Sequence, residues 1–180
     1  MGHLGFSHLG LATRDMEATL DFYQNTLGFR AVRCDILKVA EGGEIQHVFF
    51  DTGEGQMIAF MGPRGVEGIP ADYDAGINGG LGLPDGMIHF AFEAGSPEAL
   101  AAKRAELLEK GVRVTAIVDH EWCRSIYFKD PNGIDLEYCC VTRELSDDDA
   151  RMQVRAEIST RRRPASRRFV GLDPSSGSGD

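Results

Sequence analysis

Two short stretches of the chain, Gly5-Phe-Ser-His8 and Gly86-Met-Ile-His89, share a glycine that is followed three residues later by a histidine. Each stretch opens an apolar run, and each run is followed by a helical pattern and then by three strand-like segments. A further match, Phe50 with Phe128, lies late in each copy. Internal repetition of this kind predicts two βαβββ modules, and each module is too short to bury a good core alone, so we expect the two to pack together.

The first copy predicts one helix among four strands. Asp15 has the chemistry of an N-cap, apolar residues follow at helical spacing, and Gly28 is a typical stop signal. The predicted elements are a strand at 6–12, a helix at 16–27, and strands at 30–37, 45–51 and 57–61.

The second copy repeats this order. Ser96 followed by Pro97 predicts a helix start, and Gly111 predicts the end of that helix. Asp130-Pro-Asn-Gly133 has the composition of a tight turn between two strands. The predicted strands of this copy lie at 87–92, 112–118, 123–129 and 134–141.

Composition limits the possible functions. The 180 residues are 42% hydrophobic and 26% charged, with a formal net charge of −9, which is typical of a globular protein and argues against binding to nucleic acid by the acidic main body. No apolar run is long enough to cross a membrane, and the N-terminal residues do not have the pattern of a signal peptide, so we expect a cytoplasmic protein. The four cysteines have no metal-binding spacing and predict reduced, mostly buried thiols.

Two segments lie outside the repeat. Residues 62–85 are rich in Gly and Pro with little periodicity, which is typical of a lid, a binding loop or a linker. After the last strand, Ser146 and the three aspartates that follow it predict a helix start, and an arginine cluster at 161–163 suits the end of that helix. Residues 143–180 are therefore expected to form a C-terminal helix and a flexible basic tail.

Three residues with metal-ligand chemistry fall on related strands. His8 and His89 occupy the same place in the two copies, and the two-residue period of a strand puts each opposite the apolar face. Glu137 lies on the less apolar face of the last strand. If the repeats pack about a pseudo-twofold axis, the three side chains converge in one cleft, and two histidines with one carboxylate suit Fe(II).

The sequence resembles the vicinal oxygen chelate superfamily, which includes glyoxalase I, methylmalonyl-CoA epimerase, fosfomycin-inactivating thiol transferases, bleomycin-binding proteins and type I extradiol dioxygenases. The resemblance rests on the stretches 6–11, 22–29 and 125–137 and covers residues 4–142, with modules at about 4–61 and 86–142 joined by 62–85. It implies an α+β fold in which two paired βαβββ modules form an open, cupped mixed β-sheet around a divalent metal. Carried over residue by residue, the ligands are His8, His89 and Glu137.

One departure from the family helps to choose the reaction. Glyoxalase I and the epimerase use a fourth ligand from the last strand of the first module, and the matching position here is Ala59, which has no donor atom. A three-ligand site fits the dioxygenases and the fosfomycin enzymes better. Tyr127 precedes Glu137 by the spacing of the extradiol dioxygenases, whose tyrosine hydrogen-bonds the substrate. His120 and His47 are further acid–base candidates.

The resulting hypothesis is a metal-dependent dioxygenase that chelates a catechol-like substrate to Fe(II) and brings O₂ beside it. Mn, Ni, Zn or Co remain possible metals. The alternatives are a glyoxalase-like lyase or isomerase, a thiol transferase, or a metal-free binding protein of the bleomycin-resistance type. A homodimer or higher homo-oligomer is expected because open sheets expose edges.

Overall fold

A computed structural model of the chain describes residues 5–40 and 42–151. The chain divides into two compact units. The first contains the residues up to Gly82 together with Lys129–Ile134, and the second contains Leu83–Phe128 and the chain from Asp135 onward. Each unit holds one four-stranded mixed sheet and few helices, so the fold is α+β, as the repeat predicts.

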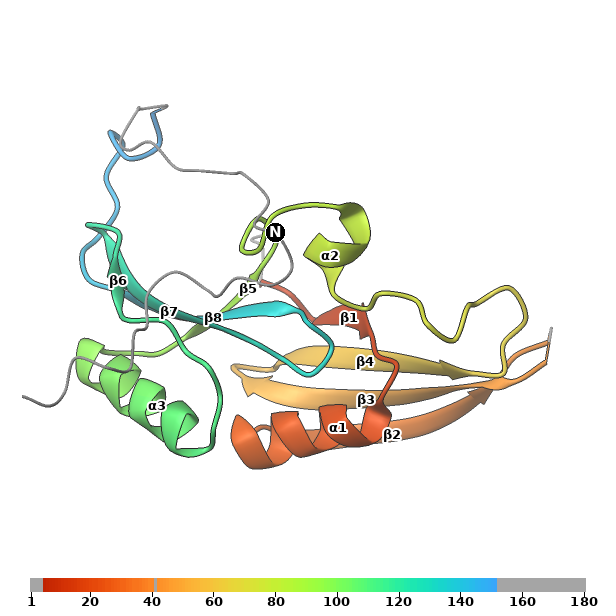
Figure 1. Ribbon diagram of the computed structural model, residues 1–180. Coiled ribbons are helices and arrows are strands. Elements are labelled where there is room, and N and C mark those ends of the chain that lie inside the picture. The colour runs from red at the N-terminus through yellow and green to blue at the C-terminus, as the bar shows by residue number, and fades with distance from the viewer. Residues whose placement is uncertain (1–4, 41, 152–180) are drawn as a thin grey trace, which may run out of the picture. The chain divides into compact units, whose positions relative to one another are not determined.

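The first unit follows the order strand, helix and three strands. Its sheet has the order β1-β4-β3-β2, in which β1 runs parallel to β4 and the other neighbours are antiparallel (Figure 1). The elements are β1 (His8–Ala12), α1 (Met16–Asp21), a π-helical turn η1 (Phe22–Thr26), β2 (Arg30–Lys38), β3 (Glu44–Gly53), β4 (Gln56–Arg64) and the short helix α2 (Ile77–Leu81).

The predicted helix caps of this unit are confirmed. The Asp15 side chain accepts a hydrogen bond from the backbone N–H of Ala18, and Gly28 takes the left-handed φ of 84° that favours glycine after a helix. The sequence pattern did not reveal that the last turn, η1, is π-helical. The wider turn lets two consecutive residues, Phe22 and Tyr23, both face the core.

The core of the first unit is built around Tyr23, whose side chain is completely buried. Its ring lies 5.2 Å from that of Phe50 on β3 and 4.7 Å from that of Phe60 on β4. The α1–η1 segment therefore covers the sheet face that carries these phenylalanines. Residues of β1 alternate as predicted: Leu11 faces this core, and His8 belongs to the opposite face.

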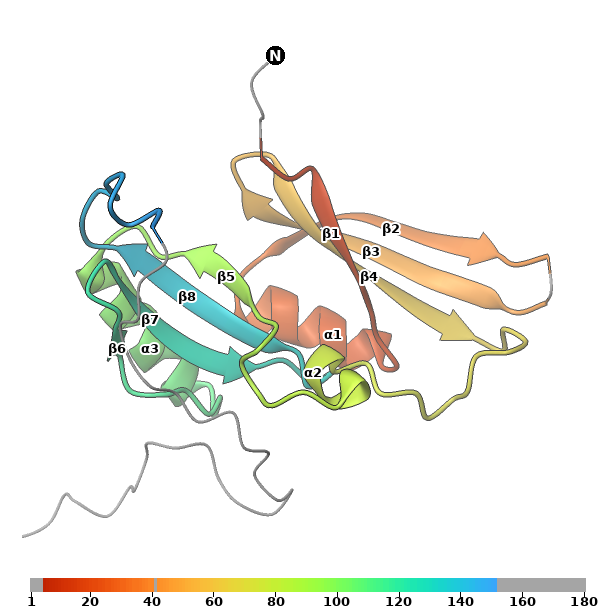
Figure 2. The same ribbon diagram turned by 90° about the horizontal axis from the view of Figure 1, so that it is seen from above.

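The second unit repeats the arrangement. Its sheet has the order β5-β8-β7-β6, with β5 parallel to β8 (Figure 2). Ser96 caps α3 by accepting a hydrogen bond from Ala99, as predicted, and Leu100 and Leu107 on that helix are completely buried. The elements are β5 (Phe90–Glu93), α3 (Pro97–Glu109), β6 (Val118–Asp119), β7 (Cys123–Lys129) and β8 (Asp135–Val141).

Several local predictions need correction. The strand expected at 112–118 is reduced to β6, because the preceding chain pairs with β7 only through isolated contacts such as the Thr115 N–H to the Tyr127 carbonyl. The connection at 62–85 is not free of regular structure, since it contains the end of β4 and all of α2. Cys34 is exposed rather than buried.

After β8, residues 147–150 form a turn, and the remainder of the C-terminal helix and tail that the sequence predicts lies outside the described residues. In the part of the chain that the structure describes, no helix has the length and apolar character needed to cross a membrane.

The turn between β7 and β8 belongs to the first unit and supplies its polar core. The Asp130 carbonyl accepts from the N–H of Gly133, which confirms the predicted turn. Asp130 Oδ1 accepts the N–H groups of Asn132 and Ile134 at 2.9 and 2.8 Å, and its Oδ2 accepts the Tyr23 hydroxyl at 3.3 Å. Burial raises the pKa of Asp130 above its ordinary value, and these hydrogen bonds oppose that shift.

Asn132 anchors the same turn to the first helix. It accepts the Thr13 hydroxyl at 2.8 Å and donates its side-chain amide to the Thr19 hydroxyl at 3.2 Å. Both threonines are completely buried. The two hydroxyls also contact each other and the Asp15 carbonyl, so Asn132 joins a buried polar network at the start of the helix.

We expect Asp130→Ala to lower the free energy of unfolding by about 2 kcal/mol or more, because it leaves several buried donors without an acceptor. Urea denaturation measures this loss, and exposed Asp147→Ala is the control, with an expected change below about 0.5 kcal/mol.

The pH dependence gives the Asp130 prediction a second test. A raised folded-state pKa means that the stabilisation from this carboxyl is complete below its unfolded pKa of about 3.9 and is lost as the pH rises through the folded value. The stability difference between wild type and Asp130→Ala should thus be larger at acidic than at neutral pH. An equal difference at both would contradict the assigned pKa direction.

Candidate metal centre and active site

The site is built around Glu137, a carboxylate in the middle of β8. Its neighbour across the parallel pair with β5 is Ala91, and its side chain is almost completely buried, with 5% exposed. Asp135, on the same face, is 4% exposed. The less apolar face of this strand is therefore covered rather than solvated. A carboxylate buried in this way requires charged or hydrogen-bonding partners.

His89 is the first partner of Glu137. Its Nε2 lies 3.0 Å from Oε2 of Glu137, and its Nδ1 donates to the backbone carbonyl of Gly86 at 2.9 Å. The carbonyl can only accept, so this contact places a proton on Nδ1 and leaves Nε2 as the atom that faces the carboxylate. An imidazole held through its other nitrogen is the usual arrangement of a histidine metal ligand.

Gly86 shapes this arrangement. Its φ of 80° is a backbone conformation that favours glycine, and its own N–H donates to Oδ2 of Asp135 at 3.2 Å. Asp135 therefore holds Gly86, and Gly86 holds His89. Sequence reasoning missed both supporting residues, although the repeated glycine three residues before each histidine was a usable signal: Gly5 has a similar φ of 86°.

The geometry of His89 and Glu137 fits a bound metal ion. Two ligand atoms that bind one ion at about 2.1 Å and at right angles to each other lie about 3 Å apart. The Nε2–Oε2 distance is 3.0 Å. An imidazole and a carboxylate suit iron, manganese, zinc, nickel or cobalt, so this pair can supply two neighbouring ligands.

Tyr127 on β7 borders the same pair. Its ring centroid lies 5.9 Å from that of His89 in an edge-on arrangement. Burial, reinforced by the negative charge and hydrogen bonding of Glu137, raises the pKa of Tyr127 to about 12. Its hydroxyl is therefore neutral at physiological pH and lies 2.9 Å from Nε2 of His120.

His120 is presented by the tight turn between β6 and β7. The turn is closed by a hydrogen bond from the His120 N–H to the Cys123 carbonyl at 2.9 Å, and Glu121 takes a left-handed φ of 72°. Asp119 accepts from the Glu121 N–H at 2.8 Å and from Arg124 at 3.1 Å, and these contacts lower its pKa. The exposed His120 ring thus belongs to a turn that several hydrogen bonds hold in place.

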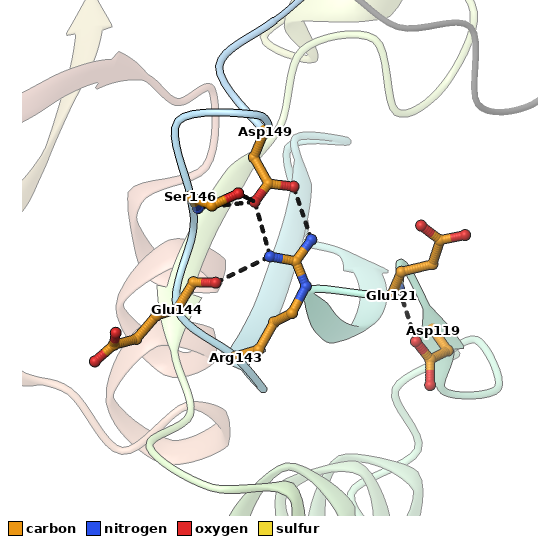
Figure 3. A network of polar contacts seen from close by, with 6 residues as sticks. All are labelled: Asp119, Glu121, Arg143, Glu144, Ser146 and Asp149. Carbon is orange, nitrogen blue, oxygen red and sulfur yellow. Dashed lines mark hydrogen bonds and ion pairs between the residues drawn. The ribbon is translucent and has the colours of Figure 1, made fainter.

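The chain that follows β8 lies beside this turn (Figure 3). The Thr142 N–H donates to the Trp122 carbonyl at 2.9 Å. Arg143 donates to both carboxylate oxygens of Asp149, at 2.8 and 2.7 Å, and Asp149 also accepts from the N–H and hydroxyl of Ser146. The Arg143 guanidinium holds the pKa of Asp149 well below its usual range. Sequence reasoning predicted a helix start here and missed this closed loop.

A thiol lies on the Glu137 face of β8 as well. Burial raises the pKa of Cys139 to about 12, and the nearby Cys123 and Glu137 add to the shift. The thiol is therefore protonated at neutral pH, which makes it a poor nucleophile and a poor metal ligand. The chemistry of this face comes from its histidines, its tyrosine and its carboxylate.

The two remaining predicted residues, His8 and His47, lie in the first unit. The register of its strands puts both on the sheet face opposite the aromatic core. Phe49, on the same face, lies with its ring 5.5 Å from that of His8 and 4.4 Å from that of His47. His8 is exposed and contacts the Ser7 hydroxyl at 3.2 Å.

The second unit thus brings together four of the six predicted residues: His89, Glu137, Tyr127 and His120. Across residues 5–40 and 42–151, no group of three or more His, Cys, Asp and Glu side chains is gathered as a metal site. The three-ligand set with His8 therefore stays a prediction.

Residues 5–138 match the model of the Glyoxalase/Bleomycin resistance protein/Dioxygenase superfamily. An iron-dependent extradiol dioxygenase of Rhodococcus jostii (strain RHA1) is 26% identical over 157 residues, which are 82% of this chain and 46% of that protein. The chain thus spans about half the length of this curated relative.

Solved structures share the fold at low sequence identity. The antibiotic-binding protein TnmS3 of Streptomyces sp. CB03234 has a TM-score of 0.54 at 19% identity, covering 79% of this chain and 99% of that one. The fosfomycin resistance protein FosX of Listeria monocytogenes has a TM-score of 0.53 at 21% identity, covering 77% and 93%. These likenesses concern the fold, and the family match covers most of the chain: the protein belongs to the Glyoxalase/Bleomycin resistance protein/Dioxygenase superfamily.

Proposed function

We propose that the protein is a metal-dependent oxidoreductase that cleaves a catechol-type ring with O₂, with Fe(II) held by His8, His89 and Glu137. The observation that carries this proposal is the 3.0 Å pair of His89 Nε2 and Glu137 Oε2, bordered by Tyr127, whose hydroxyl contacts His120. The relative named as an iron-dependent extradiol dioxygenase supports the choice of iron and of reaction class.

The bound metal would supply Lewis acidity toward two adjacent substrate oxygens and an electron for O₂. The protein's own residues then have separate tasks. His89 is held in its ligand tautomer by the Gly86 carbonyl, and the buried Glu137 provides negative charge that balances a cation. Because little of Glu137 is exposed, water is largely kept from this side of the site.

Tyr127 and His120 are suited to handle the substrate's protons. The neutral Tyr127 hydroxyl can hydrogen-bond an oxygen of the substrate, because its raised pKa keeps its proton in place. His120 Nε2 and the Tyr127 hydroxyl share a hydrogen bond of 2.9 Å, and the His120 ring is exposed to solvent. A proton taken from the substrate thus has a path through two hydrogen-bonded groups to water.

In the first unit, the sheet face that carries His8 also carries an aromatic residue and a second histidine. Phe49 offers an aromatic edge beside His8, and His47 packs against Phe49 with its ring half-buried. An aromatic ring stacks favourably on such a surface. We assign His47 an acid–base or orienting role toward a polar group of the substrate.

The competing functions make different use of the same residues. A lyase, an isomerase or a thiol transferase would hold a redox-silent ion, and a metal-free binding protein of the bleomycin-resistance type would need none. The arrangement of Asp135, Gly86 and His89 favours a metal-dependent activity, because it orients a nitrogen toward Glu137.

Gly86→Ala should weaken Fe(II) binding by about 10- to 100-fold, because the strained backbone no longer presents the carbonyl that orients His89. Anaerobic Fe(II) titration followed by metal analysis measures the effect. Gly95→Ala is the matched control: Gly95 has a φ of 78° in the same unit, so that variant carries similar backbone strain. Equal affinity in both variants would contradict the role of Gly86.

Direct ligand variants extend this test. His89→Ala and Glu137→Ala should each leave less than a tenth of the wild-type metal content, and His8→Ala should behave in the same way if the first unit supplies the third ligand. Full metal content in His8→Ala would remove that residue from the ligand set while leaving the other two in place.

The iron-loaded protein should consume O₂ and give a yellow ring-cleavage product with at least one member of a catechol panel. His120→Gln and Tyr127→Phe should lower kcat by about 10²- to 10⁴-fold with metal content unchanged, because they remove proton transfer and not metal binding. Tyr138→Phe is the control, since that ring stacks on Phe128 in the core. No turnover across the panel by a fully iron-loaded protein would overturn the dioxygenase assignment.

A further inference from the structure

The strand β2 forms one edge of the first sheet and exposes several apolar side chains. β2 pairs with β3 on one side, and among the described residues no strand pairs with its other side. Three of its apolar side chains are exposed: Val32 by 39%, Ile36 by 60% and Leu37 by 45%. The free Cys34 thiol is exposed as well. An edge strand presents a row of backbone N–H and C=O groups to which another strand can pair.

The charges of β2 are arranged symmetrically about Cys34. Arg33 and Asp35 flank it, and their side chains form an ion pair at 2.6 Å on one face of the strand. Farther out lie Val32 and Ile36, followed by Ala31 and Leu37. An antiparallel partner with the same sequence, centred on Cys34, would therefore place Arg33 opposite Asp35 and apolar residues opposite apolar residues.

Neighbouring registers are much less favourable. Two copies that keep the same faces of their sheets aligned must be centred on a residue, because a shift by one position turns side chains to the opposite face. Centring on Arg33 puts two arginines opposite each other, and centring on Asp35 does the same with two aspartates. Directly opposed like charges destabilise a strand pair, and opposite charges stabilise it.

We propose that two copies of this chain pair through their β2 strands, antiparallel and centred on Cys34, to form a continuous sheet across a twofold axis. The ends of the strand are compatible with this register. Arg30 and Lys38 lie beyond the central residues of the pair, and each has an ion-pair partner on β3, Asp51 and Glu44 respectively.

A β-bulge limits the interface to a short central stretch. The register between β2 and β3 shifts between Ala31 and Arg33, so Val32 is an extra residue, and regular pairing runs from Arg33 to Lys38. Bulges bend an edge strand and restrict how far a partner can extend. We therefore expect a dimer that dissociates on dilution rather than a fibre-forming edge.

Cross-linking tests the register directly. In the proposed pair the two Cys34 residues lie opposite each other, where Cβ atoms are about 5 Å apart and a disulfide needs little movement. Diamide accepts the two electrons and two protons that two thiols lose as the disulfide forms. Wild type treated with diamide should give a covalent dimer on a non-reducing gel, and Cys34→Ser should not.

A displaced thiol provides the matched control. In the double variant Cys34→Ser/Ile36→Cys, the introduced thiol would lie opposite Val32 of the partner, and the two thiols would be about 13 Å apart along the strands. This variant should dimerise without cross-linking. Efficient cross-linking of it would overturn the Cys34-centred register.

A charge exchange tests the interaction that selects the register. Arg33→Asp should raise the dimer dissociation constant at least about tenfold, because both ion pairs become repulsive, and Arg33→Asp/Asp35→Arg should restore it. Sedimentation velocity over a dilution series measures the constant, and far-UV circular dichroism checks folding. The proposal would be overturned if the wild type stayed monomeric at every concentration, or if Arg33→Asp left the dimer dissociation constant unchanged. Neither readout depends on metal or turnover.

Discussion

A carboxylate in the centre of a sheet imposes a constraint on everything around it. Glu137 is almost completely removed from water, so its charge must be balanced by neighbouring groups or by a cation. In the second unit the partners of Glu137 are His89, which lies just before β5, and Tyr127 on β7. Because β8 lies between β5 and β7, the two partners reach Glu137 from both sides. The order of the strands is thus what allows the site to exist.

Much of the fold could be predicted because its signals are local. Asp15 and Ser96 cap their helices as the sequence indicated, and β7 has the predicted bounds because Asp130–Gly133 forms its turn. The π-helical turn at Phe22–Thr26 could not be predicted, since it arises from burying adjacent aromatic rings against strands distant in sequence. The strand expected at 112–118 was too long for a related reason: its apolar residues suit a strand, but its neighbour offers only isolated hydrogen bonds.

The reactive side chains of the site could be predicted from the sequence, but the residues that hold them in position could not. Histidines, tyrosine and glutamate are visible in a sequence because few residue types have their chemistry. Gly86 acts through its own backbone N–H and carbonyl, which every residue carries, and the Asp135 carboxylate accepts that N–H. The repeated glycine three residues before each histidine marks the position of Gly86, but its contacts with Asp135 and His89 depend on the fold. The same distinction applies to the closed loop of Arg143 and Asp149, whose charges suggested a helix.

The turn at Lys129–Ile134 belongs to the first unit, and this delays the folding of that unit during synthesis. Thr13, Thr19 and Tyr23 leave the ribosome early, but their partners Asn132 and Asp130 follow more than a hundred residues later. The N-terminal module cannot complete its polar core until the second hairpin has been made. Contacts so distant in sequence slow folding and leave the early module exposed to aggregation while it waits. The first unit therefore finishes folding only after most of the second copy of the repeat has been made.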